Sequence, residues 1–414
     1  MEESNCERDN QAHTQADSTP GYRCVPEIRF RGFTYAWERQ RLGGVSEFYS
    51  GGTPSVGIKE YYGGEIPFIR SAEINSEVTE LFLTKEGLKN SSARLVDIGD
   101  ILYALYGATS GEVGRARLKG AINQAILAIK PHMGYNSEYL TQWLRKSKHK
   151  IIETYLQGGQ GNLSGTIVKE LLVDFPSLTE QQKIGITLRS LDSLVTLHQR
   201  KLTKLHHIKK ALLEKMFPTP GSTIPDIRFQ GFTETWELHK VGDFLTESQI
   251  RGNTGLEAKK LTVKLRGKGV VEKNDVGGSE HTRYFIRRKG QFIYSKLDFL
   301  NAAFGVIPEN LDTYESTADL PAFDLDGMNP YFMLFTATQK NFYLKHGSIA
   351  DGSRKAKRIH TDTFLNMPIT VPTIDEQNFV VSCFQYLDSL ATLHQHKLNK
   401  LHCIKKALLE KMFV

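Results

Sequence analysis

The sequence predicts an α+β protein made of two copies of one plan, each a globular domain followed by a long helix. The main observation is a 27-residue repeat: residues 191–217 recur as residues 387–413 with 23 identical positions. A shorter repeat, residues 26–38 and 225–237, precedes each globular stretch and has nine identities in 13 positions. Two long units exclude a solenoid and indicate a duplicated chain with an internal pseudo-two-fold axis.

Composition shifts along the chain predict the order of its parts. Residues 1–25 are polar and acidic, which favours a disordered lead-in. Residues 218–224 include Pro218, Pro220 and Gly221, which are turn formers typical of a linker. The predicted parts are residues 1–25 as the lead-in, 26–175 as the first domain, 176–217 as a central helix, 218–224 as the linker, 225–371 as the second domain and 372–414 as a C-terminal helix.

Each 27-residue copy is predicted to be helical, because its apolar residues recur at steps of three and four. Thr179 with Gln182 gives a capping-box start, Thr373 or Asp375 gives the second start, and Pro218 ends the first helix. A helix over residues 179–216 is roughly 57 Å long at about 1.5 Å per residue.

One apolar stripe on so long a helix needs a partner, and we expect each helix to pack antiparallel on its own copy as a coiled coil. The alternative is two unrelated surface helices, each packed on its own domain. The residues predicted to pack between helices or against another subunit are Leu191, Leu194, Leu202, Leu205, Ile208, Leu212, Leu387, Leu390, Leu398, Leu401, Ile404 and Leu408. His198 and His394 lie on or beside the stripe, either as buried residues that set the register or as ordinary, partly exposed histidines.

The two globular stretches are not recognisably alike in sequence. Both contain glycines and short β-type runs, such as residues 99–106 and 291–294. Each also has one helix-like patch, at residues 137–155 and 331–344. Two similar frames around two unlike inserts suggest one scaffold that carries two different readers.

The overall composition and net charge indicate the broad class of protein. The chain is 40% hydrophobic and 24% charged, has no 18-residue apolar run and has no apolar signal region at its start. Its four cysteines form no C-x-x-C pair, which favours reduced thiols in the cytoplasm. The net charge of +7 is compatible with a polyanionic partner but does not demonstrate one.

No catalytic constellation is found. Asn329-Pro330-Tyr331-Phe332 resembles the adenine-holding box of amino-methyltransferases, but it lacks the second proline and a cofactor loop, so a helix start is favoured. Residues 107–114 are glycine-rich but lack the Gly-Lys-Ser/Thr ending of a phosphate loop, so we predict a turn. His394 and His396 point in different directions on a helix, which makes a metal site improbable.

Several motifs, in order and partly duplicated, carry a family resemblance. They are the P-E-I-R-F-x-G-F-x-x-x-W-E motif, the strings S-G-G-T-P-S, Y-G-G-E-I-P-F-I-R, G-D-I-L and Y-G-A-T-S-G, the string G-G-Q-G-N-L-S at 158–164, and the Glu180-Gln181 helix start. Together they resemble the specificity (S) subunit of type I restriction-modification systems. The second insert lacks the G-G-T-P-S and Y-G-A-T-S-G strings, so its residues carry over less securely.

The resemblance implies two target-recognition domains, each reading half of a split DNA site, separated by two long antiparallel helices that are conserved in that family. It also implies that two modification (methyltransferase) subunits dock on this chain and that restriction subunits join that core. S-adenosylmethionine, ATP and magnesium would belong to those partners, and this chain would have no cofactor and no metal.

Basic and polar residues in the inserts are the DNA-binding candidates, although most charge runs are only solvated faces. They are Lys59, Tyr61, Arg70, Thr109, Ser110, Gln160 and Asn162 in the first insert, and Lys259, Lys260, Lys264, Arg266, Lys268, Lys296, Ser353, Arg354, Lys355 and Lys357 in the second.

The resulting hypothesis is a cytoplasmic DNA-recognition subunit without catalysis of its own. Unlike inserts predict an asymmetric site, and a spacer of two long helices suggests a target of about 13 to 16 base pairs with an unread middle. A single-chain methyltransferase or nuclease with unrecognised motifs is one alternative. A coiled-coil adaptor that does not bind DNA is another.

Overall fold

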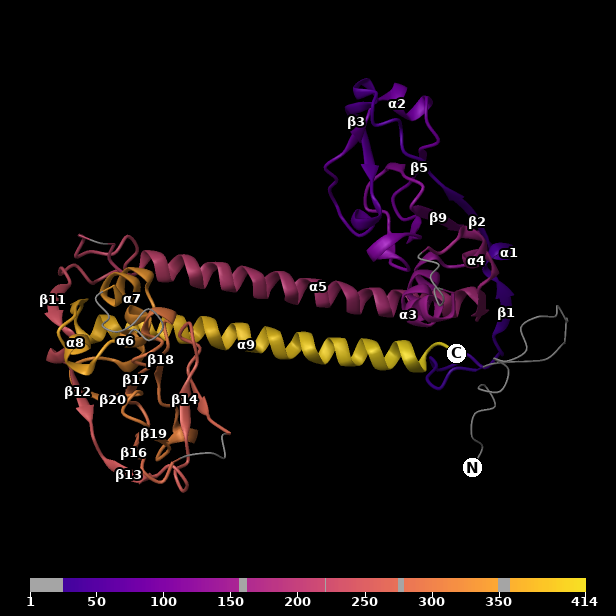
Figure 1. Ribbon diagram of the computed structural model, residues 1–414. Helices are drawn as coiled ribbons and strands as arrows, with labels where there is room; N and C mark the ends of the chain where they lie inside the picture. Colours follow the sequence, from indigo (N-terminus) through magenta and orange to yellow (C-terminus); the bar gives the residue numbers. More distant parts are fainter. Residues whose placement is uncertain (1–24, 156–161, 220, 275–278, 349–357) are drawn as a thin grey trace, which may run out of the picture. The chain divides into compact units, whose positions relative to one another are not determined.

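The computed structural model describes residues 25–155, 162–219, 221–274, 279–348 and 358–414. The chain divides into two compact units (Figure 1). The first unit is Met1–Leu197 with Lys397–Val414, and the second is His198–His396. The mixture of strands and helices confirms the predicted α+β class.

The first unit is built on a four-stranded antiparallel sheet in the order β2-β9-β6-β7. Its strand β6 lies between β9 and β7, and its run I-L-Y-A is fully buried. The turn before this strand needs Gly99, which has a φ of +95°. A second sheet, β4-β3-β8-β5, contains the parallel pair β3 and β8, and β1 pairs with β10. The bounds are β1 Glu38–Arg41, β2 Ser46–Ser50, β3 Tyr62–Ile69, β4 Phe82–Leu83, β5 Arg94–Val96, β6 Ile101–Ala104, β7 Val113–Arg115, β8 Gly120–Ile122, β9 Ile126–Pro131 and β10 Leu172–Phe175.

Helix α3 (Ser137–Tyr155) has the bounds predicted from the sequence. It buries Tyr139, Leu140, Leu144 and Ile151 in the main core of the first unit. Short helices complete this unit: α1 Leu42–Val45, η2 Lys59–Tyr61, η3 Ser71–Glu73, α2 Lys85–Lys89, η4 Gly107–Thr109 and α4 Gly165–Glu170. The turn predicted at residues 107–114 is confirmed as far as residue 112, with positive φ at Gly107 and Gly111, whereas Val113 and Gly114 already belong to β7.

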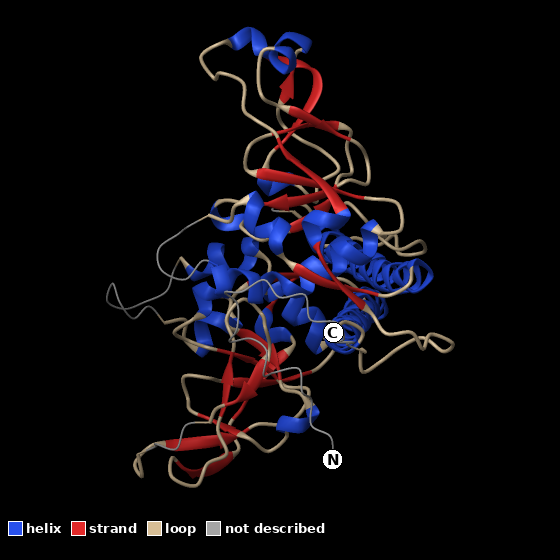
Figure 2. Ribbon diagram, turned by 90° about the vertical axis from the view of Figure 1, so that its right-hand side faces the viewer, coloured by secondary structure: helices blue, strands red, loops and turns tan. Residues whose placement is uncertain are grey.

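The second unit repeats the plan of the first although the inserts differ in sequence. Its main sheet, β12-β20-β17-β18, has the same order of first, last and two middle strands, and β11 pairs with β21 as β1 pairs with β10. Two smaller sheets, β13-β16-β19 and β14-β15, are particular to this unit; strands appear in red in Figure 2. The bounds are β11 Glu237–Lys240, β12 Leu245–Ser248, β13 Arg251–Thr254, β14 Leu261–Val263, β15 Val270–Glu272, β16 Arg283–Ile286, β17 Phe292–Tyr294, β18 Phe304–Val306, β19 Glu315–Ser316, β20 Ala322–Leu325 and β21 Pro368–Val371.

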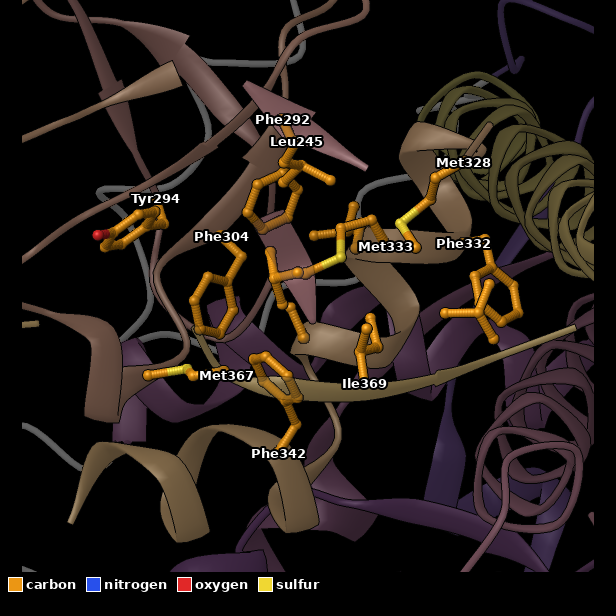
Figure 3. Packing of buried hydrophobic residues seen from close by; sticks show 14 of the residues in the cluster. Leu245, Phe292, Tyr294, Phe304, Met328, Phe332, Met333, Phe342, Met367 and Ile369 are labelled. Atoms are coloured by element: carbon orange, nitrogen blue, oxygen red, sulfur yellow. The ribbon is translucent and has the colours of Figure 1, made fainter. Parts of the chain in front are cut away.

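The core of the second unit is rich in aromatic side chains. Phe292 and Phe304 of the sheet lie on the side of the covering helix that carries Met333 (Figure 3). Phe332 of the same helix lies on its other side and packs against Phe217 and Trp236. Burying such side chains contributes roughly 1.5–3 kcal/mol each. The Tyr294 hydroxyl also donates to the Ile359 carbonyl at 3.0 Å. The helices are η5 Val241–Asp243, η6 Phe299–Asn301, η7 Glu309–Leu311, α6 Pro330–Ala337, α7 Lys340–Gly347 and α8 Thr361–Leu365.

The helix-like patch at residues 331–344 is two helices, α6 and α7, and not one. The break falls at Gln339, whose backbone is extended, with a φ of −67° and a ψ of 133°. The predicted helix start at Asn329-Pro330 is confirmed. The Asn329 side chain accepts from the N–H of Tyr331, and Pro330 fills the first helical position.

Two 38-residue helices, α5 (Leu178–Lys215) and α9 (Ile374–Lys411), confirm the long helices. Helix α5 begins at Leu178, so Thr179 lies inside it and the predicted capping box at that residue is wrong. The Ser177 hydroxyl instead accepts from the Glu180 N–H at 3.4 Å. The second helix begins directly after Thr373, one of the two predicted starts.

Candidate nucleic-acid interface

Each unit holds the start of its long helix with the same buried ion pair. In the first unit, Arg29 donates two hydrogen bonds to the two oxygens of Glu180, at 2.7 and 2.8 Å. In the second unit, Arg228 does the same with Glu376, at 2.6 Å for both bonds. Both carboxylates are almost fully buried, and the hydrogen bond that each arginine donates to its carboxylate raises the pKa of that arginine. The Ile-Arg-Phe motif therefore ties each globular domain to its helix.

The glutamine that follows each of these glutamates makes a second matched pair of contacts. The Gln181 side-chain oxygen accepts from the N–H of Asn136, and its amide donates to the Pro176 carbonyl. Gln377 makes the same two bonds, with Asn329 and Pro372. We call these four contacts and the two ion pairs the duplicated frame. It fixes the helix that covers each main sheet relative to the start of the long helix.

In the second unit the long helices run antiparallel. The Nδ1 atoms of His198 and His394 are 2.9 Å apart, and Lys209 donates to both oxygens of Asp388 at 2.5 and 2.7 Å. Residue numbers therefore rise along one helix as they fall along the other. In the first unit, Lys405 pairs with Asp192, the repeat counterparts of Lys209 and Asp388. Both histidines are half-buried, which is between the two predicted alternatives.

The predicted packing residues do not all lie on this seam. Leu194, Ile208 and Ile404 are 43%, 38% and 38% exposed, so they lie off the interhelical stripe. Leu398 is buried, and the remaining eight leucines are half-buried. Packing of the exposed residues against another subunit stays a prediction.

The predicted DNA-binding residues of the first unit fall in two places. Asn162 forms an isolated bridge with Tyr106, which brings it beside the turn that carries Thr109 and Ser110. Ser110 is buried and its hydroxyl donates to the Leu105 carbonyl, which is a structural role. Gln160 lies outside the described residues.

The other three predicted residues, Lys59, Tyr61 and Arg70, lie at the two ends of strand β3 in the second sheet of that unit. Lys59 is exposed and Tyr61 is half-buried, both in η2 directly before β3. Arg70, directly after β3, donates to Glu73 at 2.6 Å and to Glu80 at 2.9 Å. These carboxylates neutralise its charge, so a contact with DNA would have to displace at least one of them.

The second unit gathers three predicted cations on one hairpin tip. Strands β14 and β15 are joined by residues 264–269, and Lys264, Arg266 and Lys268 are all exposed there. None of the three has an ion pair with a residue that the structure describes. Arg266 has a φ of 61°, a left-handed conformation that costs a non-glycine residue roughly 1–2 kcal/mol. Strain of this kind is concentrated at functional sites.

Other residues of the predicted basic stretch differ in how far they are exposed. Lys260 is 6% exposed with its ammonium 5.9 Å from the Tyr284 ring, whereas Lys259 is exposed and Lys296 is half-buried. Arg287, part of the same charge run, is 1% exposed. Ser353, Arg354, Lys355 and Lys357 lie outside the described residues.

Sequence reasoning missed the frame arginines and the cations of helices α5 and α7. The identity of Arg29 and Arg228 within the short repeat was the available signal. Lys209, Lys210 and Lys340 gave none, because isolated lysines on helices look like solvated residues. In the described part of the chain, no three His, Cys, Asp or Glu side chains gather closely enough to hold a metal ion, and no helix is long and apolar enough to cross a membrane.

Fold and site together define a class: a duplicated protein in which one repeated frame carries two unlike globular domains. Residues 35–207 match the family model described as type I restriction modification DNA specificity domain. The chain is 30% identical over 226 residues to the type I restriction enzyme MjaIX specificity subunit of Methanocaldococcus jannaschii. That match covers 50% of this chain and 51% of the relative, so it spans about half of that protein's length.

Two further comparisons span most of the chain. The MjaVIII specificity subunit of the same organism is 19% identical over 399 residues, covering 90% of this chain and 91% of the relative. The crystal structure of the type I restriction-modification S subunit from M. genitalium superposes with a TM-score of 0.55 at 14% identity, covering 94% and 99% of the two chains, which shows a common fold. The chain is thus similar in sequence to type I specificity subunits, and it shares the fold of one of them. The matches do not support a single-chain methyltransferase or nuclease.

Proposed function

We propose that the chain is the DNA-recognition subunit of a type I restriction-modification complex. Each unit reads one half of a bipartite, asymmetric DNA site, and the chain positions partner adenine methyltransferase and restriction subunits over it. The domain limits predicted above, 26–175 and 225–371, are the proposed target-recognition domains.

The observation that carries this proposal is the contrast between the duplicated frame and the domains that it holds. The frame repeats bond for bond, from Arg29–Glu180 to Arg228–Glu376. The surfaces do not repeat: the second unit has the strained, cationic hairpin tip, and the first unit has the β3–β8 sheet. A repeated support with two unlike readers suits a site whose halves differ in sequence.

Partner docking is supported by apolar side chains that the long helices leave exposed. Helix α5 exposes Leu194 and Leu197, and helix α9 exposes Phe379, Tyr386 and Leu393. Phe379, Tyr386 and Leu393 are spaced by seven residues and so share one helix face. We propose that this face and the α5 surface that carries Leu194 and Leu197 receive the two modification subunits, since exposed apolar surface marks interaction sites.

In this proposal the chain performs no chemistry. S-adenosylmethionine, ATP and magnesium act on the partner subunits, and the methyltransferase extrudes its target adenine from the duplex. The complex would act in the cytoplasm, where reduced thiols persist; Cys383 and Cys403 are both free.

The test is single-molecule sequencing of methylated adenines in a host that expresses this chain with a cognate modification subunit. The control host expresses the modification subunit alone. We expect a split, asymmetric motif that appears only when this chain is present.

A second experiment tests the contribution of the second unit by itself. Substituting Lys264 and Lys268 together by glutamine removes two hairpin-tip charges of the second unit only and leaves Arg266 in place. We expect degraded or lost recognition of one half-site and an unchanged preference at the other. No motif at all with a stably bound, competent modification subunit would contradict the proposal and favour an adaptor that does not read DNA.

A further inference from the structure

The second unit contains a polar cleft that the function proposed above does not yet use. It has a volume of about 610 Å³ and lies between three segments: helix α5, the β14–β15 hairpin tip and the junction of α6 with α7. Its lining includes Lys209, Lys210, Arg266, Thr338 and Lys340.

The charge of the lining is predominantly positive. Lys209 is held by Asp388, but Lys210, Arg266 and Lys340 have no ion pair within the described part of the chain. Glu214 is the one acidic residue of the lining. Three uncompensated cations from three different segments repel one another, so an anion that enters the cleft relieves that repulsion.

The backbone holds Arg266 at the rim of the cleft. The N–H of Arg266 donates to the Asn301 carbonyl at 2.9 Å, and the N–H of Gly267 donates to the Ala302 carbonyl at 2.8 Å. Gly267 packs against α6 so closely that a Cβ there would lie 2.5 Å from the Thr338 methyl. The strained backbone conformation of Arg266 is therefore fixed by its neighbours, which keeps this residue at the rim of the cleft.

The first unit shows what closes such a cleft. Asn136 and Asn329 occupy equivalent places in the duplicated frame, and the ninth residue after each is Arg145 or Thr338. Arg145 donates to Asp192 at 3.1 Å, and Asp192 also pairs with Lys405. In the second unit the short Thr338 leaves the counterpart Asp388 to Lys209 alone, and the space stays open.

We propose that this cleft binds a phosphodiester group of the DNA backbone, with Lys210, Arg266 and Lys340 as its ligands. Leu213 and Leu334, which also line the cleft, offer apolar surface to the flanking deoxyriboses. The contact rests on the DNA-recognition function proposed above and deepens it: it positions the second unit on the duplex but reads no base. The first unit, where Arg145 is already paired, lacks an equivalent contact.

The test measures DNA affinity against salt concentration for the full-length chain in its complex with the modification subunits. Lys210→Gln, Arg266→Gln and Lys340→Gln are compared with Lys406→Gln, the repeat counterpart of Lys210. Loss of one phosphate contact lowers the slope of log affinity against log salt by about 0.9. We expect each cleft variant to lose affinity by the same factor on target and on random DNA, with the methylated motif unchanged, and Lys406→Gln to behave as wild type.

Thr338→Arg distinguishes the cleft from mere positive charge. It adds a cation but places a guanidinium where Arg145 lies in the first unit, so we expect weaker binding and a lower slope. Stronger binding by Thr338→Arg, or wild-type slopes for all three glutamine variants, would overturn the proposal.

A titration of the wild-type chain with inorganic phosphate tests whether the cleft binds free phosphate and not the phosphodiester groups of DNA. Saturable binding of free phosphate that DNA does not displace would overturn the assignment to DNA. If the wild-type complex shows no preference for target DNA, the proposed function fails. If it shows that preference but the glutamine variants keep the wild-type slope of log affinity against log salt, only the proposal for the cleft fails.

Discussion

Buried arginines in this chain serve two different purposes. Arg29 faces a buried carboxylate, whereas Arg287 donates to the Ser316 hydroxyl at 2.7 Å and to the carbonyls of Ser248 and Leu320 at 2.8 and 3.1 Å. Burial lowers the pKa of Arg287 to about 10, because these partners are neutral. Both arginines therefore join distant parts of the chain, Arg29 through a carboxylate and Arg287 through neutral acceptors. The sequence alone does not distinguish either of them from a cation that is free to bind DNA.

Arg287→Ala should destabilise the second unit by about 3 kcal/mol, because three buried acceptors lose their donor. Arg288→Ala is the matched control, since that neighbour is largely exposed and should change stability by less than about 0.5 kcal/mol. Urea unfolding of the full chain measures both. Equal stabilities together with a DNA-binding defect confined to Arg287→Ala would instead indicate direct recognition.

Arg266→Gly should raise the free energy of unfolding by about 0.5–1 kcal/mol, although it removes a cleft cation. Glycine adopts a φ of 61° without the steric cost that arginine incurs, and that gain exceeds the added entropy of the unfolded chain. Arg266→Ala is the control and should not stabilise, because alanine keeps the Cβ. A stability loss in the glycine variant would show that the Arg266 side chain contributes packing that outweighs its strain.

At the scale of elements, periodicity predicted the long helices but not which of their apolar residues meet. Leu188, Leu191, Val195, His198, Leu202 and Leu205 form a continuous buried or half-buried row, and Leu194 and Ile208 fall beside it. The helix carries apolar residues on more than one face, so spacing alone could not choose the seam. The break between α6 and α7 was not predicted, because it falls at the extended Gln339 and no proline or glycine marks it.

The duplicated frame allows a matched pair of substitutions. Glu180→Gln leaves Arg29 buried without its counter-charge, and Glu376→Gln does the same to Arg228; each should cost about 3 kcal/mol. Hydrogen exchange should show faster opening of the first unit in one variant and of the second unit in the other. Uniform loss of protection over both units in either variant would mean that the chain unfolds as one cooperative block.

At the scale of the whole molecule, the sequence predicted the duplication but hid its extent. The two inserts share no recognisable sequence, yet their main sheets have the same strand order. A sheet order is specified by hydrophobic alternation and turn positions, which many sequences satisfy. The DNA-binding surface was less predictable, because whether a lysine is exposed, paired or buried depends on contacts distant in sequence.

Matched deletion of residues 195–201 and 391–397 should shorten the unread spacer of the DNA target by about three base pairs. Seven helical residues correspond to about 10.5 Å, and removing the same segment from both helices keeps the register of Lys209 with Asp388 and of Lys405 with Asp192. Sequencing of methylated adenines reports the spacer directly, with both half-site sequences expected to persist. Simultaneous loss of both half-sites in a complex that still assembles would contradict the idea that these helices set the spacing.

The cores of the two units include the last residues of the long helices. Met216 and Phe217 are buried in the core of the second unit, and Met412 and Phe413 in that of the first. On the ribosome, the second unit is therefore contiguous and can close once residue 396 has emerged. The first unit, although synthesised earlier, keeps an open pocket in its core until Phe413 arrives. The order of synthesis and the order of folding are thus reversed, and the first unit needs protection from aggregation for as long as the second takes to be made.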